Sequence, residues 1–209
     1  LQNVPYTQRE DLAITYHVKV SGNRDSIGSL MITNELMEVY GVTKEKLHTQ
    51  AMENMGRLSP PVFLPLGEMI VDVMTEDFGR NEGVSQEEAK EYVKDMIPTG
   101  GPNVYCLTNQ YKMNGAVGIM SESIQQMVAD RVGGDYYVLP SSVHEVLIVP
   151  QSAGMDPEEL TDMVNTVNEG CVMQDEILSD HVYQYDAKEH KLSLCAPAKE
   201  MKQEQTMEQ

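Results

Sequence analysis

The densest group of residues able to do chemistry lies in the segment GGDYYVLPSSVHEVLIVP, residues 133–150. Ser141, Ser142, His144 and Glu145 supply the residue types of nucleophilic catalysis, which needs a hydroxyl, a base that activates it and a carboxylate that orients the base. One hypothesis is therefore a hydrolase of unknown substrate. Either serine would be the nucleophile and His144 the base, with Glu145 or a distant carboxylate as the orienting group.

The spacing of this cluster favours a structural interpretation. Catalytic triads usually assemble from distant segments, and no GxSxG nucleophile elbow occurs. Along a strand, His144 and Glu145 would point to opposite faces. A proline followed by two serines is typical of a tight turn, in which the proline fixes φ and the hydroxyls bond the local backbone. We favour the turn and keep the hydrolase as the alternative.

A second group of residues has the chemistry of metal ligands. Asp180, His181, Asp186, Glu189 and His190 fall on one predicted hairpin, and a zinc site needs three or four converging ligands. Neither HExxH nor CxxC spacing occurs, and polar residues near a turn are usually solvated. We therefore predict no metal site, and a metal-dependent protein using the two histidines is the third hypothesis.

Two Thr-Asn pairs, Thr33-Asn34 and Thr108-Asn109, each follow an apolar run. Asparagine at a strand end commonly caps a helix or closes a turn, and a polar site built from both amides is the functional alternative. The glycines at 100–101 lack the spacing of a phosphate-binding loop and its Lys-Ser/Thr. We therefore predict no cofactor.

The charge of the chain limits its partners. Its 209 residues include 33 Asp or Glu against 15 Lys or Arg, for a net charge of −18. Nucleic acids and anionic lipids are bound through clustered basic residues, and no Lys/Arg run occurs. We therefore expect no nucleic-acid or membrane partner and an unidentified protein partner instead. The oligomeric state is open.

The three cysteines, Cys106, Cys171 and Cys195, are widely spaced and form no CxxC motif. This usage is typical of free thiols in a reducing compartment. No apolar run approaches the roughly 18 residues of a membrane helix, and no signal peptide is visible. We therefore expect a cytoplasmic protein. Because the chain opens at Leu1 without methionine, we also expect a fragment.

The N-terminal part mixes strands and helices. Strict alternation predicts one half-buried strand over 11–21, and an apolar run predicts a second over 29–33. Asn34 is expected to cap a short helix that stops at Gly41, and Thr43 to cap a helix over about 44–56. The apolar residues of the latter, Leu47, Ala51 and Met55, repeat on one face and predict a buried stripe. A further apolar helix is favoured over 66–75.

The C-terminal part is more regular. Strands are predicted at 104–108, 116–120, 136–139, 144–149, 181–185 and 191–195, with helices beginning at Ser121 and Asp156. Ser85 and Glu88 have the spacing of a capping box. Short strands joined by tight turns favour antiparallel pairing, and helices that recur after strand pairs would cover one face of the sheet. The predicted fold class is α+β.

Composition also suggests boundaries. Residues 97–103, IPTGGPN, read as a linker between an N-terminal α+β half at 1–97 and a C-terminal ββαββαββ half at 98–195. Residues 196–209 are rich in Lys, Glu and Gln and poor in apolar residues, which predicts a frayed tail.

Several segments occur in the order ITNELMEVYGVTKEKLHTQAMENM, YCLTN with NGAVG, GGDYYVLPSSVHEVLIVP, DPEEL and LSDHVYQYD. Together they resemble one uncharacterised family of gut-bacterial proteins that is catalogued as a domain of unknown function. The resemblance covers most of residues 1–195 and implies an α+β bacterial protein. Members of that family carry residues ahead of the point that matches Leu1, which agrees with a fragment. The resemblance implies no activity, catalytic residue or cofactor.

From these observations we predict a non-enzymatic interaction or regulatory domain of a bacterial protein. The chain has no complete catalytic motif and no cofactor fingerprint. Its fifteen methionines fill irregular cores and can also line adaptable binding surfaces. The two leading hypotheses differ in geometry. A hydrolase requires a ring nitrogen of His144 about 3 Å from a serine hydroxyl, and an interaction domain requires a grooved or convex apolar surface.

Overall fold

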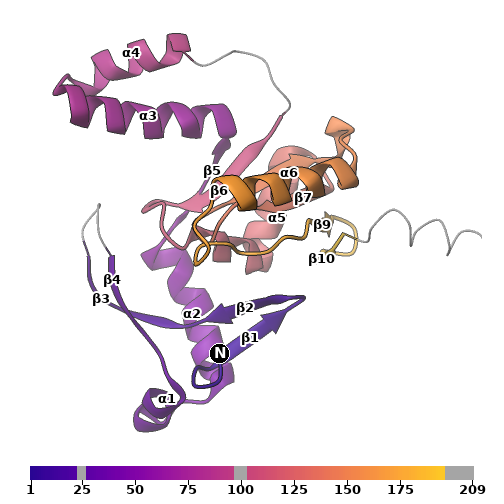
Figure 1. Ribbon diagram of the computed structural model, residues 1–209. Coiled ribbons are helices and arrows are strands. Elements are labelled where there is room, and N and C mark those ends of the chain that lie inside the picture. Colours follow the sequence, from indigo (N-terminus) through magenta and orange to yellow (C-terminus); the bar gives the residue numbers. More distant parts are fainter. Residues whose placement is uncertain (23–26, 97–102, 196–209) are drawn as a thin grey trace, which may run out of the picture.

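The computed structural model describes residues 1–22, 27–96 and 103–195 (Figure 1). The strands are β1 (Tyr6–Arg9), β2 (Leu12–Thr15), β3 (His17–Gly22), β4 (Ile27–Met31), β5 (Pro61–Pro65), β6 (Tyr105–Asn109), β7 (Tyr136–Pro140), β8 (Val146–Pro150), β9 (Tyr183–Asp186) and β10 (Lys191–Leu194). The helices are α1 (Asn34–Tyr40), α2 (Lys44–Leu58), α3 (Leu66–Glu82), α4 (Gln86–Met96), α5 (Glu122–Val132) and α6 (Pro157–Gly170), with 3-10 helices η1 (Gly115–Met120) and η2 (Gln151–Ala153).

One antiparallel sheet of six strands organises the fold, in the order β10-β9-β7-β8-β6-β5. The central hairpin of β7 and β8 places Leu139 opposite Leu147. The remaining strands form two separate hairpins, β1-β2 and β3-β4. These sheets and the helices between them confirm the predicted α+β class and its antiparallel pairing.

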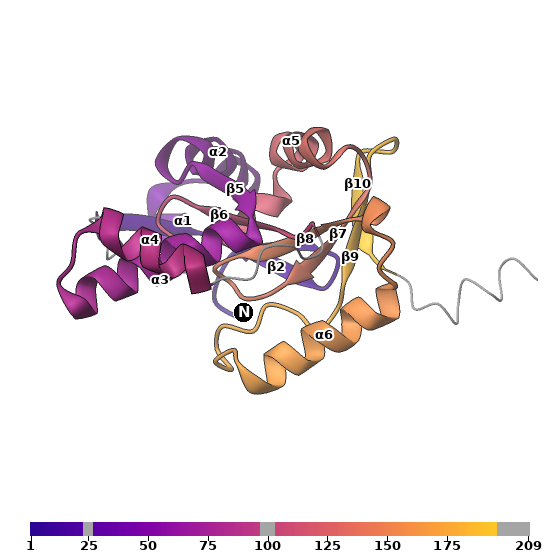
Figure 2. The same cartoon turned by 90° about the horizontal axis from the view of Figure 1, so that it is seen from above.

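The helices cover both faces of the sheet, whereas the sequence suggested one. Val138 and Ile148 lie in one hydrophobic cluster with Val128 of α5, and Val149 lies in another with Leu160 of α6. Figure 2 shows α5 and α6 on opposite sides of the strands. Because successive strand residues point to opposite faces, the nearly continuous apolar runs of β7 and β8 need cover on both.

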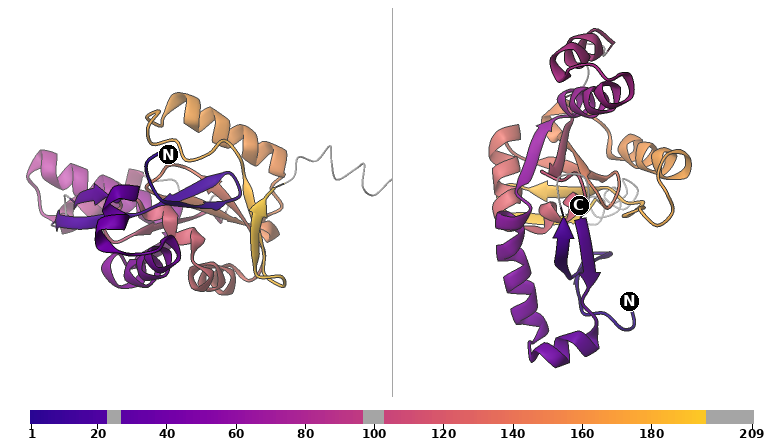
Figure 3. Two further views of the ribbon diagram at one scale, coloured as in Figure 1. Left: turned by 90° about the horizontal axis from the view of Figure 1, so that it is seen from below. Right: turned by 90° about the vertical axis from the view of Figure 1, so that its left-hand side faces the viewer.

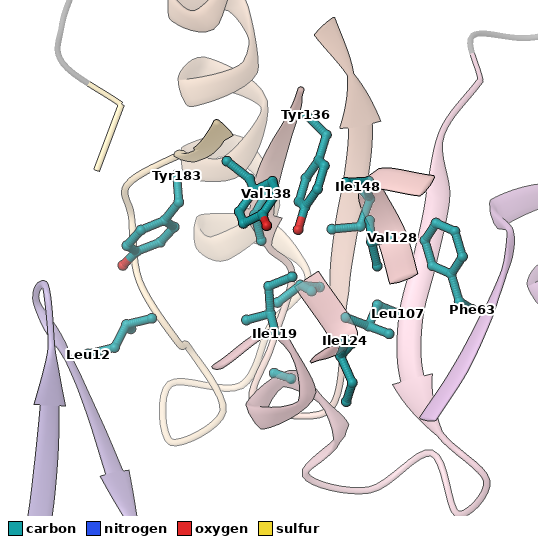
Figure 4. Packing of buried hydrophobic residues seen from close by; sticks show 14 residues of the cluster. Leu12, Phe63, Leu107, Ile119, Ile124, Val128, Tyr136, Val138, Ile148 and Tyr183 are labelled. Atoms are coloured by element: carbon teal, nitrogen blue, oxygen red, sulfur yellow. The ribbon is translucent and has the colours of Figure 1, made fainter. Parts of the chain in front are cut away.

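Tyrosines supply most of the aromatic rings in the main core, with Phe63 beside them (Figure 4). The rings of Tyr136 and Tyr185 stack with centroids 4.9 Å apart. The Tyr136 hydroxyl donates to the carbonyl of Gln125 at 3.2 Å, which satisfies its polar end inside the core. Desolvation raises the pKa of Tyr136 far above its ordinary value, so the ring stays neutral.

The predicted strand over 11–21 is two strands that bend apart at Tyr16. β2 pairs with β1, and β3 pairs with β4. The alternation is correct up to the buried Tyr16, but Val18 and Val20 are 40% and 69% exposed. β1 was not predicted, because its sequence YTQR has no apolar alternation.

The strand predicted over 116–120 is wrong, since the chain forms the 3-10 helix η1 there. Asn114 has a left-handed backbone with φ of 51°, which turns the chain away from β6. The N–H groups of Gly115 and Ala116 then donate to the carbonyls of His144 and Val143. A short apolar run fits a helix or a strand equally well by periodicity, and this tertiary contact decides between them.

Helix ends follow local chemistry closely. The predicted caps at Thr43 and Asp156 are confirmed by hydrogen bonds from Lys46 N–H and Glu158 N–H. The capping box of α4 is also confirmed, with hydrogen bonds of 3.1 and 3.3 Å joining Ser85 and Glu88 in both directions. For α1 the prediction is off by one residue: the hydroxyl that accepts from Leu36 N–H belongs to Thr33 and not to Asn34.

β5 connects the two parts of the chain that the sequence separated at residue 97. It precedes the predicted boundary, yet it pairs with β6 along its whole length. Its terminal prolines, Pro61 and Pro65, suit the edge position that β5 holds in the sheet. Most of the predicted linker, residues 97–102, and the predicted tail, residues 196–209, lie outside the described residues.

Helices α3 and α4 pack against each other and project from one end of the sheet (Figures 1 and 3). The helix predicted over 66–75 is confirmed and extends to Glu82. None of the described helices combines the length and the apolar composition that crossing a membrane requires.

Candidate functional site

A cleft of about 660 Å³ separates the N-terminal hairpins from the main sheet. Its volume falls within the range of typical ligand sites, roughly 300–1,000 Å³. Three parts of the chain enclose it. They are the strands β2 and β3, the helix α2, and η1 with the loop before it; Leu12, Ile14, Ile32, Met120 and Leu178 are among its apolar residues.

Helix α2 turns its apolar face toward this cleft. Leu47, Ala51, Met55 and Leu58 all border it, at helical spacing. The sequence predicted that this stripe would be buried, and this is correct in part. Leu47 and Ala51 are half-buried against the cluster of Ile14, Tyr16 and Ile32, but no residue of α2 is fully buried, and Leu58 is 41% exposed. Figure 3 shows α2 running beside the N-terminal hairpins, with no other described helix along most of that stretch. The exposed part of the apolar stripe, above all Leu58, is therefore available for contact.

The cleft lacks the acidic character of the rest of the protein. Among the described residues that border it, none is Asp or Glu, although the whole chain has 33. Lys19 is the only Lys or Arg in that set, and its ammonium lies 4.4 Å from the ring centre of Tyr111. Desolvation lowers the pKa of His17, which keeps this ring uncharged at neutral pH. The cleft thus suits an uncharged, mainly apolar occupant.

The base of the cleft at β2 is fixed by a hydrogen-bonded group. The hydroxyl of Tyr16 lies 2.5 Å from Thr7 Oγ1 and 3.0 Å from Nδ1 of His48 on α2. Tyr16 is only 2% exposed. These bonds tie the β1-β2 hairpin to α2, so the two walls of the cleft are held at a set separation.

The serine cluster singled out from the sequence forms a turn beside the cleft. Ser142 is buried; its hydroxyl donates to Glu145 Oε1 at 2.9 Å and accepts from the N–H of His144 at 3.0 Å. β8 begins only at Val146, so these residues are not in a strand. Ser142 and Glu145 are brought together, while Ser141 makes no side-chain hydrogen bond among the described residues.

Both ring nitrogens of His144 are engaged in hydrogen bonds. The N–H of Asn114 donates to its Nδ1 at 3.1 Å, and its Nε2 lies 3.2 Å from Oε1 of Glu176. An amide N–H can only donate, so Nδ1 is the acceptor. Nε2 therefore carries the hydrogen and donates a hydrogen bond to the Glu176 carboxylate. The ring contacts neither serine hydroxyl, and in this arrangement it has no lone pair free to activate one.

We expect Ser142→Ala to lower the free energy of unfolding by about 1.5 kcal/mol, because it leaves the partly buried Glu145 carboxylate and the His144 N–H without their partner. Urea unfolding would measure it. The neighbouring Ser141→Ala is the matched control and should change stability by less than about 0.5 kcal/mol. Equal effects of the two substitutions would contradict the structural role of Ser142.

The candidate metal ligands form hydrogen bonds with different groups and do not converge on one point. His181 Nδ1 donates to Asp11 Oδ2 at 2.8 Å, whereas His190 Nδ1 lies 3.4 Å from the hydroxyl of Tyr185. Asp186 accepts from the backbone of its own turn. Within the described ranges, no three His, Cys, Asp or Glu side chains are grouped as metal ligands.

Asp11 accepts several hydrogen bonds from distant residues, which the sequence did not indicate. Its carboxylate accepts from Tyr183, from Ser179 at 3.1 Å and from His181. It lies at the turn of the β1-β2 hairpin, and its partners come from the opposite end of the chain. Because Leu12 and Leu178 beside this contact both border the cleft, Asp11 fastens the outer end of the cleft wall.

The Thr-Asn pairs also have local roles. Thr33 caps α1. Asn109 organises the loop after β6, since its Oδ1 accepts from Tyr111 N–H at 2.9 Å and its Nδ2 donates to Met113 O at 2.7 Å. Thr108 Oγ1 donates to His144 O at 2.8 Å. The loop that they hold borders the cleft.

The cleft itself was not found from the sequence. The one signal that pointed to it was the apolar repeat of α2, which reads equally well as a core face. The sequence of residues 12–19 did not indicate a site. Alternation in a strand predicts that one face is buried, but it does not show which part of the molecule covers that face.

Comparison with known proteins identifies the family of the chain. No curated protein and no solved structure gives a significant match to the chain. A family model described as "Family of unknown function (DUF5688)" matches residues 1–187. The resemblance found in the sequence motifs is thereby confirmed, and the chain belongs to the DUF5688 family.

Proposed function

We propose that this protein is a non-enzymatic interaction domain that takes an apolar segment of a partner protein into the cleft beside α2. The observation that carries the proposal is the cleft of about 660 Å³, one wall of which is an amphipathic helix without a single buried residue. An exposed apolar stripe of this kind marks an interaction site on soluble proteins.

The energetics of the cleft favour binding. Fully burying a Leu or Met side chain contributes about 1.5–3 kcal/mol relative to leaving it exposed. Leu47, Met55 and Leu58 are each partly exposed toward the cleft, so an occupant that covers them gains several kcal/mol. After the cost of association, this supports a dissociation constant on the order of micromolar.

The chemistry of the surroundings argues for a protein partner over other classes. The net charge of −18 repels nucleic acids and anionic lipids. We further infer a cytoplasmic location from the cysteines, which are all free thiols, with Cys171 exposed. Burial raises the pKa of Cys106 to about 12, so this thiol is not a reactive group.

Selection of peptides from a displayed random library tests the proposal. Peptides that bind the wild-type protein should lose affinity by at least about tenfold for Ala51→Phe, because the added ring occupies the cleft. Thr49→Phe is the matched control: it adds the same ring to an exposed position of α2 that does not border the cleft. Fluorescence anisotropy with the selected peptides would give both dissociation constants.

Two results would contradict the cleft as the binding site. The first is a selection in which no peptide is enriched over an empty support. The second is a set of peptides that bind Ala51→Phe and Thr49→Phe equally well. Thermal unfolding of both variants would show that each is folded before the affinities are compared.

A further inference from the structure

The strands that border the cleft each have an edge without a neighbouring strand. In the part of the chain that the structure describes, β2 pairs only with β1, and β3 pairs only with β4. An unpaired edge presents a row of N–H and C=O groups and is a template for another strand. The registers of the two hairpins determine which edge of these strands is free.

The registers place β1 and β4 on the same side of the run from β2 to β3. Leu12 pairs with Arg9 across the two-residue turn, and the carbonyl of Tyr16 accepts from Ile32 N–H at 2.8 Å. In an antiparallel ladder, alternate residues direct their backbone groups to opposite edges. Leu12 and Tyr16 are an even number of residues apart, so their backbone N–H and C=O groups point to the same edge. β1 and β4 therefore both lie along the edge formed by the even-numbered residues.

The other edge is therefore free. Its backbone groups come from the odd-numbered residues Ala13, Thr15, His17 and Lys19. Every residue from Leu12 to Lys19 borders the cleft, odd-numbered and even-numbered alike, as expected of strands that meet the cleft with an edge. The free edge and the apolar stripe of α2 thus enclose the same space.

The free edge also lacks the usual protection against pairing. Soluble proteins block exposed edges with proline, with inward charges or with bulges. Residues 12–18 contain neither proline nor a charged residue. Lys19 comes only at the far end, and the register of β3 shifts between Lys19 and Ser21, where the regular edge stops.

We propose that the occupant of the cleft is an extended segment that adds to this free edge as a strand. This inference rests on the proposed function and specifies the conformation and chemistry of the bound segment. Main-chain hydrogen bonds along the edge would supply affinity, and alternate side chains against α2 would supply specificity. The eight residues from Leu12 to Lys19 belong to β2 and β3 on either side of the bend at Tyr16, and together they accommodate at most about 26 Å of strand.

The charges determine the sequence of that segment. Its centre is uncharged, because among the described residues the cleft offers no carboxylate and only Lys19 as a cation, and it is rich in β-branched residues, because these favour strands. Its flanks are basic, because the chain as a whole carries a net charge of −18 and its acidic residues lie outside the described lining of the cleft, where they attract positive residues. A second copy of this chain fits less well, since two strongly acidic surfaces would have to meet.

N-methylation of the selected peptides tests the strand directly, since it removes an N–H donor and leaves the side chain intact. Two sets of peptides are made, one methylated at odd and one at even positions. In a paired strand only one set loses hydrogen bonds to the protein. We expect one set to bind at least about tenfold more weakly and the other to bind like the parent.

Amide hydrogen exchange on the full chain gives an independent measurement. Addition of the parent peptide should slow exchange at those of the Ala13, Thr15, His17 and Lys19 amides whose N–H groups become paired, by at least about tenfold. The amides of Ile14 and Tyr16 serve as internal controls, because they point to the edge that is already occupied.

The outcomes separate this inference from the proposed function. If both methylated sets bind like the parent while Ala51→Phe still abolishes binding, the cleft is the site but strand pairing is wrong. If the odd-numbered amides are already protected and light scattering shows a dimer, a second copy holds the edge and the inference is also wrong. If no peptide depends on Ala51, the proposed function itself fails.

Discussion

Gly115→Ala should lower the free energy of unfolding by about 3 kcal/mol and the melting temperature by about 6–12 °C. A Cβ atom at this position would lie 2.7 Å from the backbone nitrogen of Asn109 and 2.7 Å from the backbone oxygen of His144. Real Cβ atoms do not approach other atoms so closely. Both neighbours are backbone atoms, so the strain cannot be relieved by rotation of a side chain.

The contact at Gly115 joins two segments that are far apart in sequence. The carbonyl of His144 accepts from Gly115 N–H at 2.9 Å and from Thr108 Oγ1 at 2.8 Å. Any shift that makes room for a methyl group lengthens both bonds and displaces the end of β6. The loop before η1 borders the cleft, so the variant should also bind the selected peptides more weakly.

Gly118→Ala is the control, in the same 3-10 helix. The nearest atom to a Cβ there is Ile124 Cδ1 at 3.8 Å, an ordinary contact with a movable side chain. Loss of glycine also reduces the entropy of the unfolded chain, so stability should change by less than about 1 kcal/mol. Thermal and urea unfolding of both variants would compare them, and equal destabilisation would contradict the close approach at Gly115.

Helix ends and hairpins could be predicted from the sequence because each is decided by neighbouring residues. The Ser85–Glu88 box and the Thr43 cap need only a hydroxyl or carboxylate at the right spacing. The β9-β10 hairpin needs only two strands and a turn. The α+β class follows from these elements, because their order leaves few ways to bury their apolar faces.

Elements that depend on distant contacts could not be predicted in this way. β5 contains two prolines in five residues, and only its pairing with β6 makes it a strand. The apolar run at 116–120 becomes helical because the turn at 143–144 accepts its first N–H groups. Local propensity competes with tertiary contacts in both places, and the tertiary contacts prevail.

The candidate site illustrates the same limit. The motif at 141–145 drew attention because its residue types are those of catalysis, yet the hydrogen-bond partners of the His144 ring are Asn114 and Glu176, 30 and 32 residues away. The stripe of α2 was recognised as apolar, but periodicity does not show whether another part of the chain covers it. The cleft lies where that cover is incomplete.

Asp11→Asn should lower the free energy of unfolding at neutral pH by about 2 kcal/mol. The carboxylate accepts hydrogen bonds from Tyr183, Ser179 and His181, all donors. An amide has one acceptor oxygen and one NH2 group, so in the variant at least one of the three partners must change from donor to acceptor or lose its hydrogen bond. Tyr183 is 2% exposed, and water cannot readily replace its lost partner.

The pH dependence should follow from the same bonds. Desolvation raises the pKa of Asp11, but the hydrogen bonds from Tyr183, His181 and Ser179 together outweigh it and hold the pKa below its ordinary value of 3.8. A carboxyl whose pKa falls on folding stabilises the folded state above its unfolded pKa and loses that contribution as pH drops through its folded pKa. The stability gap between wild type and Asp11→Asn should therefore shrink as the pH falls below about 4.

A neighbouring substitution separates this effect from the loss of a charge. Glu10→Gln removes one negative charge from the same turn, and the Glu10 side chain makes no hydrogen bond among the described residues, so it should change stability by less than about 0.5 kcal/mol at every pH. A gap that persists unchanged at pH 3, or an equal loss in Glu10→Gln, would contradict the role of the Asp11 hydrogen bonds. Because these bonds fasten the β1-β2 hairpin beside Leu12 and Leu178, Asp11→Asn should also weaken peptide binding in the cleft, whereas Glu10→Gln should not.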